Sequence, residues 1–222
     1  MYYSAKMEKI INKAVGIIPA AGKAERFGGI LKECLPASDG ISLINHAANK
    51  LRDICDFIIV ITNKDKIQNH MQDLKNVVFI EQNNNLNLLG AVQTALQIKA
   101  DRYYFTMPDT FTEKNIFSHI SLAEDLTIGI FQTYKPERFG CLVDGIIVDK
   151  KINDAIPAIA WGALSWSRHA CAGFCNQINF TNALNFIIKN YSYSMWNINN
   201  YYDMATIKDY MEFIKVLSDD GS

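Results

Sequence analysis

The chain has 222 residues, a formal net charge of −1, and 49% hydrophobic against 20% charged residues. Such a chain can bury the core of a globular domain, and its near-neutral charge gives no sign of binding to nucleic acid or to a membrane. We expect a cytoplasmic protein. No apolar run approaches a membrane span, residues 1–13 lack the apolar core of a signal peptide, and the five scattered cysteines do not suggest a disulfide framework.

Apolar runs alternate with helical patterns through the first half of the chain. The runs predict buried strands at 15–18, 57–62, 77–80 and 103–107. The intervening patterns predict helices at 42–52, 64–74 and 88–98, the second of them exposed. This alternation favours right-handed βαβ units and a mostly parallel sheet. Because ligands bind at the carboxyl ends of such strands, the loops after them are expected at one rim.

The loop after the first predicted strand combines small residues with cations. Small residues let backbone N–H groups approach a ligand closely, and added positive charge suits a polyphosphate. The small residues are Ala20, Ala21 and Gly22, and the cations are Lys23, Arg26 and Lys32. Neither a P-loop nor a dinucleotide-binding G-x-G-x-x-G is present. An ordinary strand-to-helix turn with surface lysines is the alternative.

The pattern A-A-G-x-x-x-R-F-G, with a lysine and Leu35-Pro36 after it, resembles the nucleotide-binding loop of the sugar-phosphate nucleotidyltransferases. In these nucleoside-diphosphate-sugar pyrophosphorylases the loop and its arginine hold the triphosphate, and the lysine helps to neutralise it. The resemblance assigns these roles to Gly22, Arg26 and Lys32. Leu31 stands where the family usually has proline, and the spacing from Arg26 to Lys32 is nearer that of smaller cytidylyl- and guanylyltransferases.

Asp109 follows the fourth predicted strand in the segment Met107-Pro108-Asp109-Thr110. A carboxylate that emerges from a strand end after a proline is well placed to hold a hard cation. The segment resembles the metal-binding segment of the same family, in the form typical of a thymidylyl- or uridylyltransferase-like branch. A helix N-cap aspartate is the alternative.

Asp203 lies in a segment that resembles the family's closing W-x-D-x-x-T-x-x-D/E-Y, whose first aspartate is the second metal ligand. The resemblance therefore implies that Asp109 and Asp203 share one Mg²⁺, with carboxylates within roughly 6 Å of each other. Thr206 and Asp209, three residues apart, also predict a capping box for the last helix.

The second half of the chain is richer in predicted strands, at 126–132, 140–143, 146–148, 158–164 and 193–198. Asp144-Gly145 predicts a hairpin turn. This region resembles the family's sugar-binding half, in which a lysine contacts the sugar phosphate. Lys150 matches that lysine. If the match is shifted by one residue, Lys151 takes its place. A solvated charge pair is the alternative.

Gln82 and Gly90 are the expected base-recognition residues. A side-chain amide can pair with a pyrimidine edge, and glycine allows close backbone approach. The family uses a glutamine and a glycine in these roles. Alternatively, Gln82 faces solvent and Gly90 is part of a plain helix start. The sequence leaves dTTP, UTP and CTP open, and it does not name the sugar.

The resemblance covers residues 15–213 and implies an α/β fold, a three-layer Rossmann-like sheet of GT-A type with a strand-rich sugar-binding half. We expect a single domain over 1–222, divided at about residue 125. The implied reaction joins an NTP and a sugar 1-phosphate into an NDP-sugar and pyrophosphate, and a homo-oligomer is compatible with it. Three alternatives stay open: a cytidylyltransferase acting on a non-sugar phosphate, a non-catalytic nucleotide-sugar-binding paralogue, and a glycosyltransferase, which usually carries an Asp-x-Asp pair absent here.

Overall fold

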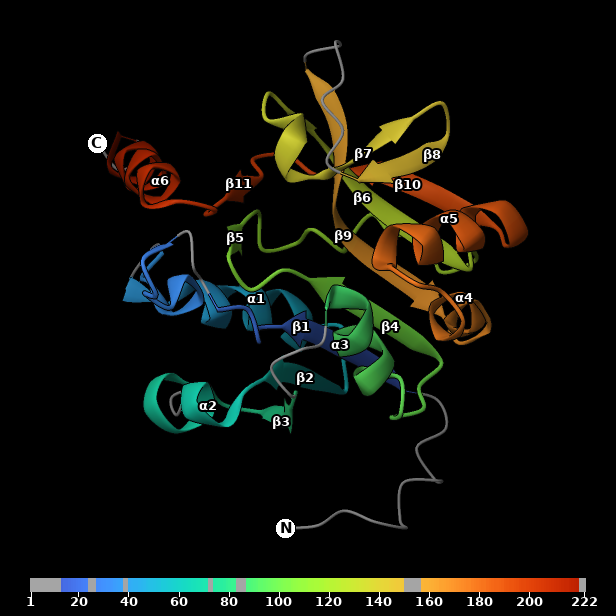
Figure 1. The fold of residues 1–222 in the computed structure, drawn as a ribbon, viewed down its shortest axis with the longest axis horizontal. Helices are drawn as coiled ribbons and strands as arrows, with labels where there is room; N and C mark the ends of the chain where they lie inside the picture. The colour runs from blue at the N-terminus through green and yellow to red at the C-terminus, as the bar shows by residue number, and fades with distance from the viewer. Residues whose placement is uncertain are drawn as a thin grey trace.

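The sheet at the centre of the molecule contains nine strands and is built from both halves of the chain (Figure 1). Seven strands run side by side in the order β10-β6-β9-β4-β1-β2-β3, and β7 and β8 extend the sheet beside β9. The computed structural model describes residues 13–23, 27–37, 40–71, 74–82, 87–149 and 157–219.

The first half of the chain forms the parallel part of the sheet. Its strands are β1 (Ala14–Pro19), β2 (Phe57–Thr62), β3 (Val77–Glu81) and β4 (Arg102–Thr106). Strand β1 pairs in parallel with both β2 and β4, and β2 pairs in parallel with β3. The apolar runs form strands here because the central ones, β1, β2 and β4, are largely buried. The four predicted strands and their parallel arrangement are confirmed.

The second half adds antiparallel pairing. Strand β9 (Ala158–Ser167) lies antiparallel between β4 and β6 (Leu126–Thr133), and β10 (Tyr193–Asn197) pairs in parallel with β6. Four of the six neighbouring pairs along the seven-strand path are parallel, which confirms a mostly parallel sheet.

The predicted hairpin at Asp144-Gly145 is confirmed. It joins β7 (Gly140–Val143) to β8 (Ile146–Asp149). Both turn residues have positive φ, 49° at Asp144 and 81° at Gly145. A two-residue hairpin turn needs this backbone geometry, and Asp-Gly adopts it at little cost.

Helices cover both faces of the sheet, so the predicted three-layer arrangement is confirmed. Helix α1 (Leu43–Arg52) packs on one face. The helices α3 (Leu88–Ala95), α4 (Ala172–Cys175) and α5 (Phe180–Asn190) pack on the other. Gly16 in β1 permits the close approach of α1, because a Cβ there would lie 2.8 Å from Leu51 Cδ1. Among the helices that the structure describes, none is long and apolar enough to cross a membrane.

Shorter elements connect these layers and surround the carboxyl ends of the parallel strands. They are η3 (Lys32–Cys34), α2 (Lys64–His70), β5 (Thr110–Phe111), η5 (Pro136–Arg138), η6 (His169–Cys171) and β11 (Tyr202–Asp203). The last helix, α6 (Ile207–Asp219), begins with the predicted capping box: Asp209 N–H donates to Thr206 Oγ1 at 3.2 Å, and Thr206 N–H donates to Asp209 Oδ2 at 2.9 Å.

One expectation needs correction, and one alternative is excluded. The helix predicted to be exposed over 64–74 ends at His70, and its Lys66 is buried, with 4% of its surface exposed. Asp109 does not cap a helix, because the chain continues directly into β5. Strand β5 pairs antiparallel with β11 and places Thr110 opposite Asp203. Each of these strands has two residues, which is too short to leave a periodic pattern in the sequence.

Candidate active site

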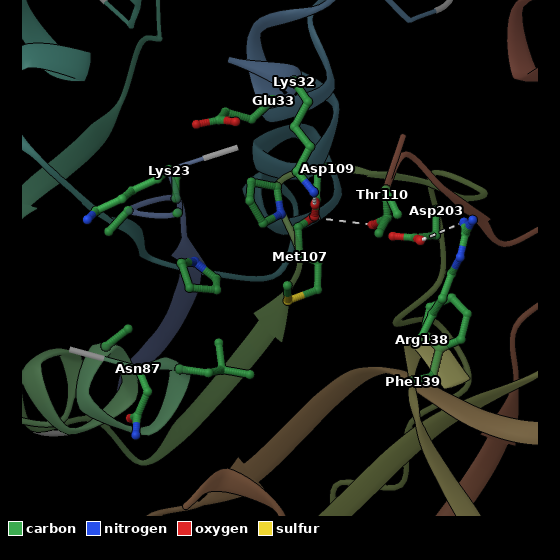
Figure 2. Close-up of a pocket in the computed structure, with 18 of the residues that line it drawn as sticks. Lys23, Lys32, Glu33, Asn87, Met107, Asp109, Thr110, Arg138, Phe139 and Asp203 are labelled. Carbon is green, nitrogen blue, oxygen red and sulfur yellow. Dashed lines mark hydrogen bonds and ion pairs between the residues drawn. The ribbon is translucent and has the colours of Figure 1, made fainter. Parts of the chain in front are cut away.

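A cavity of about 700 Å³ lies at the carboxyl ends of the parallel strands (Figure 2). Its walls come from the loop after β1, from η3, from Gln82 after β3, from the start of α3, and from residues 107–110 after β4. The second half of the chain closes it with η5, β7, β9 and the segment around β11. The loops that were expected at one rim therefore do meet there, as parallel βαβ geometry requires.

The small-residue loop forms one wall of this cavity. Ala20, Ala21, Gly22 and Lys23 all line it. A Cβ at Gly22 would meet no other atom within 4 Å, so the backbone there faces open space into which a ligand can come close. Arg26, the loop's predicted phosphate-binding cation, lies outside the described residues.

Asp109 and Asp203 line the same cavity, although they are far apart in sequence. The β5–β11 pairing brings them together, and Met204 N–H donates to the Asp109 carbonyl at 3.1 Å. Figure 2 shows Lys32, Asp109, Thr110 and Asp203 in one region of the pocket, with Asp109 Oδ2 paired to Lys32 Nζ. The two carboxylates and one lysine thus form a single charged cluster.

The charge of Asp109 affects the pKa of Asp203. Burial, together with the negative charge of Asp109, raises the pKa of Asp203 to about 6, while Lys32 and Arg138 act in the opposite direction. Asp109 Oδ1 is buried and accepts no hydrogen bond from the described part of the chain. A bound cation would relieve the cost of a buried carboxylate oxygen without a partner beside a second, half-buried carboxylate.

Gln82 is buried at the cavity wall, with 3% of its surface exposed, so the solvent-facing alternative is wrong. Its side-chain Nε2 has no hydrogen-bond partner among the described residues. Gly90 lies elsewhere, because it is buried inside α3 and is not part of the cavity wall. Its N–H donates to the N-cap Asn87 Oδ1 at 3.0 Å. The start of α3 contributes other residues to the cavity wall, namely the N-cap Asn87, Leu88 and Ala91.

Aromatic side chains line the half of the cavity that comes from the C-terminal part of the chain. They are Phe139, Trp161 and Tyr201. Gly140 allows the Trp161 indole to lie against β7, since a Cβ there would be 2.4 Å from Trp161 Nε1. Asp149 also lines the cavity, whereas Lys150 and Lys151 lie outside the described residues.

Residues 16–121, which include the loop and Asp109, match the family model of the MobA-like NTP transferase domain. Over these residues the chain therefore carries a nucleotidyltransferase domain. The matched residues include both the loop and the Met107-Pro108-Asp109-Thr110 segment, on which the sequence resemblance rests. No curated protein sequence matches the chain.

Several solved structures share the fold of this chain over nearly its whole length. A Bacillus anthracis structure assigned as a glucose-1-phosphate thymidylyltransferase, determined with a sucrose, has a TM-score of 0.81 and 18% identity over 91% of this chain and 94% of its own. A UDP-glucose pyrophosphorylase has a TM-score of 0.74 and 18% identity over 94% and 99%. The inositol-1-phosphate CTP transferase of T. maritima has a TM-score of 0.68 and 13% identity over 90% and 94%.

Nucleotidyltransferases of this family generally use a divalent metal ion. The donor set fits one, because Asp109 and Asp203 offer carboxylate oxygens, the ligands that hard divalent cations prefer. Within the described residues, no group of three or more histidine, cysteine, aspartate or glutamate side chains is arranged to hold a metal. The remaining ligands would therefore be phosphate oxygens and water, as is usual for a cation bound together with a nucleotide.

Sequence reasoning missed Arg138, which links the second carboxylate to the last helix. Its Nη1 lies 2.7 Å from Asp209 Oδ2 and 3.8 Å from Asp203 Oδ2. Lys135 Nζ also donates to Asp209 Oδ1, at 2.8 Å. No local pattern signals this network, because its members come from η5, β11 and α6 and meet only in the folded chain.

Asp209 holds this network together. Burial alone would raise its pKa, but the hydrogen bonds from Lys135, Thr206 and Arg138 outweigh it and hold the pKa well below the usual range. A lowered pKa means that the carboxylate stabilises the fold above its unfolded-state pKa, roughly pH 4, and that this stabilisation is lost as the pH falls.

We therefore expect Asp209→Asn to lower the free energy of unfolding at pH 7 by roughly 1–3 kcal/mol, through loss of charge-assisted hydrogen bonds. The difference from the wild type should be smaller at pH 3 than at pH 7, because the stabilisation by the wild-type carboxylate begins to be lost below about pH 4. Urea unfolding at the two pH values measures both quantities. An equal difference at pH 7 and pH 3 would contradict the assigned role of the charge.

Proposed function

We propose that this nucleotidyltransferase condenses a nucleoside triphosphate with a sugar 1-phosphate, releasing pyrophosphate and an NDP-sugar. One observation carries the proposal. Asp109, Asp203 and Lys32 lie in the same cavity as the small-residue loop and Gln82, whose Nε2 has no hydrogen-bond partner in the described part of the chain. A phosphate chain laid along the loop would end at the carboxylate cluster, and a base would reach Gln82.

The nucleotide is proposed to bind in the N-terminal half of the cavity. The backbone N–H groups of the loop would bind the triphosphate, with Arg26 adding positive charge. The unpaired Gln82 Nε2 would donate to a base carbonyl, which suits the O2 or O4 edge of a pyrimidine. Such a contact would be favourable, because a buried amide donor without a partner carries a desolvation cost that a hydrogen bond to the base would offset.

The acceptor phosphate is proposed to bind in the C-terminal half, whose wall includes the aromatic side chains of Phe139, Trp161 and Tyr201. Aromatic surface packs well against the C–H side of a sugar ring, while Asp149 can accept hydrogen bonds from its hydroxyls. Lys150 would bind the phosphate of this substrate. Aromatic surface and a carboxylate together favour a hydroxylated ring over an apolar alcohol phosphate.

The proposed step is an in-line displacement at the α-phosphorus. A phosphate oxygen of the acceptor forms a bond to the α-phosphorus, and the bond from that phosphorus to the bridging oxygen of the β-phosphate breaks. No protein nucleophile or base is needed, because the attacking phosphate is already ionised at neutral pH. Lys32 and Arg26 would neutralise charge on the phosphates as the bond breaks, which is electrostatic catalysis with fixed groups. Mg²⁺, when held by Asp109 and Asp203, would supply further positive charge to the phosphate oxygens.

A screen of pyrophosphate release tests the proposal. It would combine dTTP, UTP and CTP with a panel of sugar 1-phosphates, in Mg²⁺ and in EDTA. We expect release from one nucleotide with one group of sugar 1-phosphates, dependent on both substrates and on Mg²⁺. No release with any sugar 1-phosphate would overturn the proposed reaction.

A second candidate is transfer from CTP to a phosphorylated cyclic polyol. It is favoured by the structural likeness to an inositol-1-phosphate CTP transferase over 90% of the chain. A cyclic polyol presents the same hydroxylated ring as a sugar, so the aromatic half of the cavity does not separate the two. Adding inositol 1-phosphate to the screen decides between them.

The proposed base contact predicts a selective defect. Gln82→Ala should raise the KM for the nucleotide about tenfold, through loss of a hydrogen bond, and leave the KM for the acceptor phosphate nearly unchanged. Steady-state kinetics with each substrate varied in turn measures the two values. Gln97→Ala, at an exposed position just after α3, is the matched control. An equal change in both KM values would remove Gln82 from the base site.

A further inference from the structure

Beneath the small-residue loop lies a buried lysine that the proposed reaction does not use. Lys66 belongs to α2 and does not line the cavity, yet only 4% of its surface is exposed. Its ammonium donates to the carbonyl of Ala20 at 2.9 Å and to the carbonyl of Gly22 at 2.6 Å. It also forms an ion pair with the buried Glu33 of η3. All three donors of the ammonium are therefore used.

These bonds determine which way the loop's peptide groups point. In a trans peptide, the carbonyl of one residue and the N–H of the next point in opposite directions. The carbonyls of Ala20 and Gly22 point to the Lys66 ammonium, which does not line the cavity, so the N–H groups of Ala21 and Lys23 point away from Lys66. Within the described part of the chain, neither N–H donates to a backbone carbonyl.

The energetic pattern also indicates positioning rather than stability. A buried ion pair costs much of its attraction in desolvation, and replacing both partners by neutral residues is often neutral for stability. Thr62 Oγ1 donates to the same Ala20 carbonyl at 3.1 Å, so two separate side chains hold this one peptide group. Such redundancy beneath a single loop is expected where the orientation of the backbone matters.

We propose that Lys66 is a positioning residue that orients the loop 20–23 so that its N–H groups face the nucleotide phosphates, with Glu33 as its counter-ion. This inference rests on the proposed function, because it requires the loop to bind the triphosphate. Without Lys66, the Gly22 carbonyl would be free to turn towards the cavity and repel the phosphates, and only Thr62 would still hold the Ala20 carbonyl.

The test compares the wild type with Glu33→Gln, with the double variant Glu33→Gln/Lys66→Met, and with Lys64→Met as an exposed control on the same helix. The double variant removes the clamp without leaving a buried unpaired charge, so it is expected to fold. Calorimetric titration with dTTP, UTP and CTP in Mg²⁺ gives the Kd of whichever nucleotide the wild type binds. Kinetics gives both KM values, and thermal unfolding gives the melting temperature.

We expect the double variant to bind the nucleotide at least about tenfold more weakly and to raise its KM, while the KM for the acceptor and the melting temperature change little. Glu33→Gln alone should bind the nucleotide as well as the wild type or better, because it removes a negative charge from the cavity wall. Lys64→Met should behave as the wild type.

Unchanged nucleotide affinity in the folded double variant would overturn the inference, whatever its melting temperature. Equal loss in Glu33→Gln and in the double variant would overturn it too, because the effect would then belong to Glu33. If the double variant does not fold, Thr62→Val loosens the same Ala20 carbonyl, and unchanged affinity there counts against the inference. A wild type that binds no nucleotide would instead refute the proposed function itself, and the inference with it.

Discussion

Replacing Asp109 or Asp203 by asparagine is expected to lower the rate of pyrophosphate release by roughly a thousandfold or more. Asparagine keeps the size of the side chain and one oxygen but loses the negative charge that a divalent cation requires. At position 109 the change also leaves Lys32 without its ion-pair partner, whereas at position 203 it removes one of two carboxylates that repel each other. Both variants should bind the Mg²⁺–nucleotide complex more weakly in calorimetric titrations.

The same substitutions should not unfold the metal-free enzyme. The pKa of Asp203 is raised to about 6, first by burial and then by Asp109. A raised pKa means that the native state binds the proton more tightly than the unfolded state, so the wild type loses stability as the pH rises from about 4 to about 6. In EDTA at pH 7, Asp203→Asn should therefore melt at the wild-type temperature or higher.

The control for both variants is Asp101→Asn, an exposed aspartate at the opposite end of β4 from Asp109. It carries the same change in charge without touching the cavity, and it should retain wild-type kinetics. Near wild-type turnover in either Asp109→Asn or Asp203→Asn would show that the two carboxylates do not hold the catalytic metal.

Lys50→Met is expected to stabilise the protein at pH 7 by several kcal/mol. Lys50 is buried in α1, and its ammonium has no hydrogen-bond partner or counter-ion among the described residues. Burial lowers its pKa from 10.5 to about 7, and one pKa unit corresponds to roughly 1.4 kcal/mol. Methionine has a similar length and flexibility, so it should fill the same space without the charge.

The stability of the wild type should also depend on pH in a defined direction. Between about pH 7 and 10.5 the unfolded chain holds a proton on Lys50 that the native state has lost. The wild type should therefore gain stability as the pH rises through this window, and the variant should lack that slope. Urea unfolding between pH 7 and 10 measures it, with the exposed Lys99→Met as control. A destabilised variant, or an unchanged slope, would show that Lys50 has a partner in solution.

Local patterns determined much of the fold. The apolar runs at 57–62 and 103–107 became strands at nearly the predicted positions, since a buried parallel strand needs apolar residues on both faces. The Asp144-Gly145 turn and the Thr206–Asp209 capping box depend on neighbouring residues alone, so their short spacing was sufficient to predict them. The ordered motifs also indicated the nucleotidyltransferase class.

The tertiary structure alone decided how the site is assembled. Asp109 and Asp203 meet because two-residue strands pair, and Arg138 reaches Asp209 from a separate segment. The polar sequence of α2 predicted an exposed helix, yet Lys66 is buried. Its ammonium donates to two carbonyls of the loop and forms an ion pair with Glu33, and these interactions compensate for the loss of water. Sequence periodicity reports which face of an element is apolar. It carries no information on partners that only folding brings within hydrogen-bond distance.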